Sequence, residues 1–136
     1  FAATERERGW REALAHAGAV VSEPVRGDWT SASGHAAASG VGGARAIFVA
    51  NDQMALGALR ALADAGRRVP EDVAVVGFDD IVDAAEFRPP LTTVRQDFDA
   101  LGRRAVAALV AAIEGGEPIV ESVPAALVVR ASSAAL

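Results

Sequence analysis

The sequence predicts an α/β fold in which a parallel sheet is flanked by helices. Two continuous apolar runs, residues 46–50 and 73–78, have the length and composition of strands that are buried on both faces. Segments with the helical spacing of apolar residues alternate with them, separated by glycines and prolines. Strands and helices that alternate in this way form a parallel sheet, because each helix carries the chain back to the starting edge. A length of 136 residues suits one domain.

The first forty residues are predicted to form two helices and a short strand. The first helix begins near Thr4, whose hydroxyl can cap it, and ends at Gly18. The valines of residues 20–25 indicate a short strand. The small residues of Ser31–Ser39 predict a second helix, since the hydroxyls of its first turn suit capping.

The rest of the chain continues the alternation. A helix is predicted over residues 53–65, a strand over 91–96 and a long helix over 97–114. Short strands around Val120 and Val128 complete the chain. The apolar side of the first of these helices consists of Leu56, Leu59 and Leu62. The apolar stripe of the long helix consists of Phe98, Leu101, Ala105, Leu109 and Ile113.

Composition excludes several classes of function. The chain has no cysteine, which rules out disulfides and thiol nucleophiles. Its net charge is −5, and its basic residues are arginines scattered along the chain, so we expect no nucleic-acid binding by this chain alone. No apolar run is long enough to span a bilayer. The charged residues 5–8, close to Phe1, argue against a signal peptide.

Motifs of enzymes are not found. The glycine-rich residues 40–43 precede a strand, whereas a dinucleotide-binding loop follows one. Ser33 and His35 lie two apart on a predicted helix, so their side chains cannot face each other as a hydrolytic pair. We therefore expect a ligand-binding module and not an enzyme, with no cofactor and no metal.

The ends of the two apolar runs carry the candidate ligand contacts, because ligands of open parallel sheets lie beyond the carboxyl ends of the strands. Asn51 can donate and accept hydrogen bonds, which suits vicinal hydroxyls, whereas Asp52 better fits the cap of the next helix. Asp79 can accept hydrogen bonds from a ligand or cap the following turn. Together with Asp80 it could also form a magnesium dyad, although no third carboxylate is identifiable.

Four ordered motifs resemble the LacI/GalR family of transcriptional regulators. They are VANDQMALGALR at 49–60, VPEDV at 69–73, VVGFDDI at 75–81 and PPLTTVRQDF at 89–98. The resemblance extends from about Thr4 to about Arg130, nearly the whole chain.

This resemblance implies a periplasmic-binding-protein-like core of type I, in which two lobes enclose an effector in a cleft. Residues 1–92 would be the carboxyl-terminal lobe, 93–116 a strand and helix of the amino-terminal lobe, and 117–136 the returning strands and tail. The chain would thus be a partial core, mostly one lobe, without the family's DNA-binding headpiece and hinge.

The resemblance also implies roles for individual residues. Effector contacts would come from Arg6, Trp29, Asn51, Asp79 and Gln96. On the residues alone, Trp29 could be a core residue, Arg6 a solvated helix charge and Gln96 an ordinary strand-end amide. Contacts of a homodimer would come from Ala55, Leu59, Leu62 and Phe87.

The expected function is effector sensing and dimerisation for a cytoplasmic repressor that reaches operator DNA only through its headpiece. The effector implied is a saccharide, a galactoside or a related sugar, and a purine or another non-sugar stays open. The alternative is a periplasmic sugar-binding protein of a transport system, which shares the fold.

Overall fold

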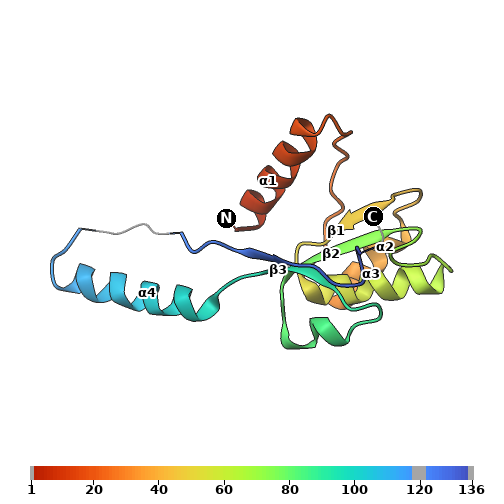
Figure 1. Cartoon of the computed structure of the whole chain (residues 1–136). Helices are drawn as coiled ribbons and strands as arrows, with labels where there is room; N and C mark the ends of the chain where they lie inside the picture. The colour runs from red at the N-terminus through yellow and green to blue at the C-terminus, as the bar shows by residue number, and fades with distance from the viewer. Residues whose placement is uncertain (1, 118–121, 135–136) are drawn as a thin grey trace.

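The structure is a computed structural model that describes residues 2–117 and 122–134. Its sheet has four strands in the order β1 (Ala46–Phe48), β2 (Ala74–Asp79), β3 (Thr92–Arg95) and β4 (Ala126–Val128) (Figure 1). β1, β2 and β3 pair in parallel, which confirms the predicted parallel sheet. β4 pairs with β3 in the antiparallel direction. The strand expected around Val120 lies outside the described residues.

The strand β1 differs from the expectation of burial on both faces. It lies at the edge of the sheet and pairs with β2 alone among the described strands. The Phe48 side chain is 38% exposed, and only Val49, just after the strand, is buried. The second apolar run behaves as predicted at its start, where Ala74 and Val75 are buried within β2. The apolar run of residues 46–50 therefore indicated a strand correctly but overstated its burial.

Two helices, α2 (Ser31–Ser39) and α3 (Asp52–Asp64), pack against each other through glycines. A Cβ atom at Gly34 would overlap the backbone of Met54, and one at Gly57 would overlap the backbone of Ser31. The two helix backbones therefore lie in direct contact, and α3 connects this pair to the sheet through its contacts with β2.

The hydrophobic core lies between α3, the sheet and the short 3₁₀ helix η1 (Val82–Glu86). The four residues expected at a dimer contact all belong to it: Ala55, Leu59, Leu62 and Phe87 are between 0% and 8% exposed. These side chains offer a partner almost no surface, because they already pack inside the chain. Leu56, expected on the buried side of α3, is instead 45% exposed, at the edge of that side.

The first helix, α1 (Ala2–His16), lies outside the layer of the sheet and has no buried residue (Figure 1). It includes Thr4 within its first turn, so Thr4 is not its cap. The strand predicted over residues 20–25 is not formed, and Val20 is 91% exposed. A strand needs a neighbour for its backbone groups, and no described strand lies beside this segment.

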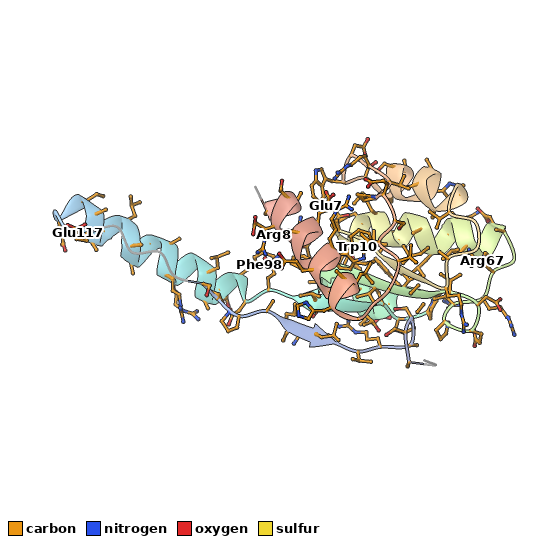
Figure 2. The ribbon with its side chains drawn as sticks, turned by 90° about the horizontal axis from the view of Figure 1, so that it is seen from above. Glu7, Arg8, Trp10, Arg67, Phe98 and Glu117 are labelled. Atoms are coloured by element: carbon orange, nitrogen blue, oxygen red, sulfur yellow. The ribbon has the colours of Figure 1, made fainter. Side chains whose placement is uncertain are left out.

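The long helix α4 (Phe98–Ile113) extends away from the body of the molecule (Figure 2). Figure 2 shows Phe98 at the end near the body and Glu117 beyond the far end. Asp97 caps the helix by accepting a hydrogen bond from the Ala100 backbone N at 2.8 Å. Its apolar stripe is exposed, with Phe98 56% and Ile113 76% accessible. No helix within residues 2–117 and 122–134 is long and apolar enough to cross a membrane.

Candidate functional site

The residues predicted to contact an effector come together at the carboxyl edge of the sheet. Asn51 follows β1, Asp79 ends β2 and Gln96 follows β3. Arg6 reaches the same place from α1, and Trp29 comes from the turn before α2. Sequence positions that span ninety residues thus share one edge, as expected for parallel strands.

Arg6 lies over two aromatic rings. Its guanidinium carbon is 4.6 Å from the centroid of Phe78 and 5.5 Å from that of Trp29. A planar guanidinium is attracted to the faces of such rings. The Nε atom of Arg6 is buried and has no hydrogen-bond partner within the described residues. Arg6 is therefore not a solvated helix charge: its side chain lies against aromatic rings, and its buried Nε lacks a partner within the described residues.

Charged side chains of α1 bind the segment that leads to Trp29. The carboxylate of Glu7 accepts hydrogen bonds from Arg26 at 2.7 Å and from Arg11 at 3.1 Å. These two bonds lower the pKa of Glu7, that from Arg26 most. Arg11 also binds Glu23 at 3.1 Å. Because Arg26 lies three residues before Trp29, this cluster connects α1 to the segment that carries the tryptophan.

Trp29 is presented by a turn that its neighbours fix. The Asp28 carboxylate accepts hydrogen bonds from the Thr30 hydroxyl at 2.6 Å and from its backbone N at 3.1 Å. These contacts, together with Ser33, lower the pKa of Asp28 to about 2. Trp29 has a φ of 73° and is 47% exposed. Its half-exposed ring rules out the interpretation as a core residue.

Asn51 joins this turn to α3. Its side-chain oxygen accepts a hydrogen bond from the Met54 backbone N at 3.0 Å, which makes Asn51 the N-cap of the helix. Its side-chain nitrogen donates to the Trp29 carbonyl at 3.1 Å. The prediction that Asp52 caps α3 was therefore wrong. Asp52 is fully buried and accepts hydrogen bonds from the Thr93 hydroxyl at 2.7 Å and the Ile81 backbone N at 3.0 Å.

Asp79 faces Gln96 across the sheet edge, and the Gln96 amide donates to the Asp79 carboxylate at 3.0 Å. Burial raises the pKa of Asp79 above its ordinary value, and the negative charge of Asp52 raises it further. The hydrogen bond from Gln96 and the positive charge of Arg6 act in the opposite direction. Gln96 is thus a partner of the central carboxylate and not an isolated strand-end amide.

The two adjacent aspartates do not form a dyad. The Asp80 carboxylate turns away from Gln96 and binds Arg95 at 2.5 Å and Arg130 at 2.7 Å. Two arginines at these distances occupy the oxygens that a magnesium ion would need. The described residues contain no group of three histidines, cysteines or acidic residues placed to hold a metal. The interpretation of Asp79 and Asp80 as a magnesium site is therefore wrong.

Phe78 was missed by the sequence analysis, although it lies closest to Arg6. Its signal was its place directly before the two aspartates at the end of a buried run. With Phe78 included, the site combines aromatic faces, a guanidinium, a carboxylate and two amides. Such a set suits a small ligand that has both apolar ring faces and hydroxyl groups.

Comparison with known proteins identifies the family. The model for the periplasmic binding protein-like domain matches residues 2–133. The lactose operon repressor of Klebsiella pneumoniae is 46% identical over 133 residues, which cover 94% of this chain and 38% of that repressor. The chain therefore spans well under half the length of this relative.

Two solved structures have the same fold. The transcriptional regulator CelR in complex with cellobiose gives a TM-score of 0.90 at 43% identity, covering 96% of this chain and 42% of that one. A dimeric Lac repressor with a C-terminal deletion gives a TM-score of 0.88 at 37% identity, covering 97% of this chain and 51% of that one. These matches confirm the resemblance on which the sequence analysis relied. The chain belongs to the periplasmic binding protein-like domain family, and the relatives that it resembles over nearly its whole length are transcriptional repressors and regulators of the LacI type.

Proposed function

We propose that this chain is the effector-sensing part of a LacI-type repressor and that its effector is a saccharide. The observation that carries the proposal is the convergence of Arg6, Trp29, Asn51, Asp79 and Gln96 on one edge of the sheet. The relative solved with cellobiose supports a sugar over a purine. Relatives that are operon repressors and regulators support this function over transport.

In this proposal each residue has a distinct part in binding. The half-exposed ring of Trp29 covers the apolar face of a sugar ring, and the guanidinium of Arg6, which lies over Phe78, binds a hydroxyl. Asp79 accepts hydrogen bonds from hydroxyls, while Gln96 and Asn51 orient the carboxylate and the tryptophan turn. No group in this set is arranged as a nucleophile with a base, which supports a binding module and not an enzyme.

Binding acts on DNA indirectly. A sugar that binds one arrangement of the two lobes more tightly shifts the equilibrium toward it. In the intact cytoplasmic repressor, the headpiece converts this shift into a change in operator affinity. The chain described here supplies the sensing half of that coupling.

We also propose that the intact protein is a homodimer and that α2 and α3 carry the contact. Their outer face has an open hollow of about 460 Å³, lined by Ser31, Ala32, His35, Leu56, Gly57 and Arg60. Leu56 is 45% exposed there, unlike the four buried residues of the original prediction. The dimeric state of the similar Lac repressor supports this placement.

A thermal-shift screen of the intact protein against mono- and disaccharides tests the sugar proposal. A sugar that binds the folded state raises the midpoint of unfolding, and the shift grows with the logarithm of its concentration once this exceeds Kd. Calorimetric titration of Trp29→Ala then examines the site. We expect a larger loss for sugars with a flat apolar face, and equal losses for all sugars would remove Trp29 from the site. A screen in which purines raise the midpoint and sugars do not would overturn the proposal.

A further inference from the structure

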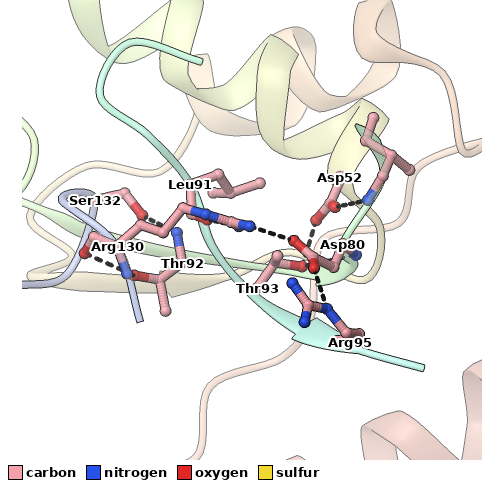
Figure 3. A network of polar contacts seen from close by, with 9 residues as sticks. Asp52, Asp80, Leu91, Thr92, Thr93, Arg95, Arg130 and Ser132 are labelled. Atoms are coloured by element: carbon pink, nitrogen blue, oxygen red, sulfur yellow. Dashed lines mark hydrogen bonds and ion pairs between the residues drawn. The ribbon is translucent and has the colours of Figure 1, made fainter. Parts of the chain in front are cut away.

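Asp80 directly follows Asp79, the proposed ligand contact, and two arginines bind its side chain. Its side chain is only 5% exposed, and its oxygens accept hydrogen bonds from Arg95 at 2.5 Å and Arg130 at 2.7 Å (Figure 3). Burial by itself would raise the pKa of Asp80, but the bonds from Arg130 and Arg95 outweigh it, so the pKa is lowered. Asp80 is therefore an anion that is fully committed within the protein.

Arg130 is itself fixed on both sides. A second guanidinium nitrogen donates to the Leu91 carbonyl at 2.7 Å, and its backbone N donates to the Thr92 hydroxyl at 2.8 Å. Two residues further, the buried Ser132 hydroxyl donates to the Val75 carbonyl at 2.6 Å and accepts from the Thr92 backbone N at 2.8 Å. The chain end that carries Arg130 is thus bound to β2 and β3, and Arg130 can act as a rigid support.

The backbone at Asp79 and Asp80 needs such a support. Both residues have positive φ angles, 116° and 55°, in the region where side chains other than glycine are disfavoured. The turn is further pinned by its amides: Asp80 N donates to the Thr93 hydroxyl at 3.3 Å, and Ile81 N donates to Asp52 at 3.0 Å. This conformation sends neighbouring carboxylates in different directions, Asp80 toward the arginines and Asp79 toward Gln96.

We propose that Asp80 and Arg130 are positioning residues that fix Asp79 and Gln96 for the effector without touching it. Arg130 holds Asp80 from the chain end, and Arg95 holds it from β3. Because Arg95 directly precedes Gln96, the same ion pairs fix both members of the hydrogen bond between Gln96 and Asp79. This inference rests on the proposed saccharide site and adds to it a residue 50 positions away in the sequence.

An ion pair with a purely structural role would behave differently. It would lower the stability of the fold when removed, and its effect on binding would not depend on whether residue 79 is a carboxylate. A positioning pair acts on binding through Asp79, so its effect disappears when the Asp79 carboxylate is absent. The interaction term of a double-mutant cycle separates the two cases.

The experiment uses the intact protein and calorimetric titration with the sugar that gives the largest thermal shift. Arg130→Gln is compared in the wild-type and Asp79→Asn backgrounds, and Arg130→Lys tests rescue by a conserved charge. Arg68→Gln is the matched control, because Arg68 also binds an aspartate, Asp72, at 2.8 Å but lies outside the site. In the wild-type background we expect Arg130→Gln to weaken binding roughly 10-fold, as partners that orient a ligating group often do.

The other variants complete the prediction. Arg130→Lys regains part of the affinity, Arg68→Gln keeps it, and Arg130→Gln costs less than about 2-fold in the Asp79→Asn background, where the carboxylate is already gone. Equal losses in both backgrounds, or no loss in the wild-type background, would overturn the inference. If Arg130→Gln does not fold, Asp80→Asn replaces it, since asparagine also tolerates positive φ, with Asp72→Asn as its control.

A measurement without ligand separates this inference from the saccharide proposal. Hydrogen exchange followed by mass spectrometry reports the amides of Asp80 and Ile81, which the turn protects. We expect faster exchange over residues 78–82 in Arg130→Gln than in Arg68→Gln. Unchanged exchange would overturn the positioning role even if the wild-type protein binds sugar. If Arg130→Gln exchanges faster but the wild-type protein binds no sugar, the inference that Arg130 supports the turn stands and only the saccharide proposal is refuted.

Discussion

At the scale of single residues, the site depends on one carboxylate whose surroundings oppose its charge. Asp79 is partly buried and lies near the charge of Asp52, so its pKa is raised, while Gln96 and Arg6 favour the ionised form. A charged carboxylate in these surroundings lowers the stability of the fold, but it strengthens the binding of a ligand whose hydroxyls donate hydrogen bonds to it. This is the balance expected at functional sites.

Asp79→Asn is therefore expected to weaken sugar binding by about 1.5–3 kcal/mol, the usual contribution of a hydrogen bond to a charged group. The free energy of unfolding at neutral pH should not fall, because the variant removes a charge that burial disfavours. Calorimetric titration and chemical denaturation measure the two quantities. Unchanged affinity would show that Asp79 is not a ligand contact.

The raised pKa of Asp79 also predicts how binding depends on pH. Only the ionised carboxylate accepts hydrogen bonds with both oxygens, so its contribution is present above its pKa and is lost as the pH falls through it. An ordinary aspartate has a pKa near 4. Because the pKa of Asp79 is raised above this value, the affinity for sugar should begin to fall at a higher pH than it would with an ordinary aspartate. Titrations between neutral and mildly acidic pH test this, with Asp79→Asn as the control that shows no such fall.

Sequence reasoning predicted five effector contacts that the fold brings to one edge of the sheet, and their contact with an effector stays a prediction. Asn51, Asp79 and Gln96 lie in family motifs at strand ends, whereas Arg6 and Trp29 were implied by the family resemblance alone. Sequence reasoning missed Phe78, which lies among them, and Arg130, whose contact with Asp80 joins positions 50 apart. It also assigned the cap of α3 to Asp52, whereas Asn51 is the cap. Both residue types cap helices, and only the fold shows that Asp52 is enclosed by Thr93 and Ile81.

At the scale of elements, sequence patterns predicted the four described α-helices and the four described strands, but not the short 3₁₀ helix η1. Within the described residues one predicted strand is not formed: residues 20–25 are rich in valine but have no neighbouring strand to pair with. The pattern of α3 likewise indicated a helix, but it placed Leu56 on the buried side, whereas Leu56 is 45% exposed. A local pattern indicates what an element can be, whereas burial depends on what the rest of the chain brings beside it.

The contact of α2 with α3 gives a prediction at this scale. In Gly57→Ala the new methyl group would overlap the Ser31 backbone, so the helices must separate. We expect a loss of about 1–3 kcal/mol in the free energy of unfolding, as overpacked cores show. Gly102→Ala on α4, where nothing lies within 4 Å, is the control and should instead gain roughly 0.5–1 kcal/mol from helix propensity. Equal stabilities by urea denaturation would mean that the helices are not in contact.

At the scale of the whole molecule, the exposed stripe of α4 stands out. Val106 and Leu109 are each 61% exposed, and α4 has no buried residue. The assignment of residues 93–116 to the other lobe of the core stays a prediction, and an unpacked apolar helix is what that assignment predicts. Leaving such a surface in water forgoes roughly 25 cal/mol for each Å².

This chain by itself, residues 1–136, is therefore expected to self-associate. Sedimentation velocity should show species larger than a monomer, and Leu109→Glu should shift the distribution toward monomer by placing a charge on the stripe. Glu114→Gln, just after the end of α4 and off the stripe, should leave it unchanged. A monomer that binds no hydrophobic dye would show that the stripe is covered within the chain.

The pairing of β3 with β4 at the base of α4 has a mechanical consequence. Because β3 is hydrogen-bonded to β2 on one side and to β4 on the other, sliding it along either neighbour would break hydrogen bonds. α4 follows β3 directly, so the end of α4 nearest the body is anchored to the sheet (Figure 1). Asp80 reinforces this anchor, because it binds Arg95 at the end of β3 and Arg130 just after β4.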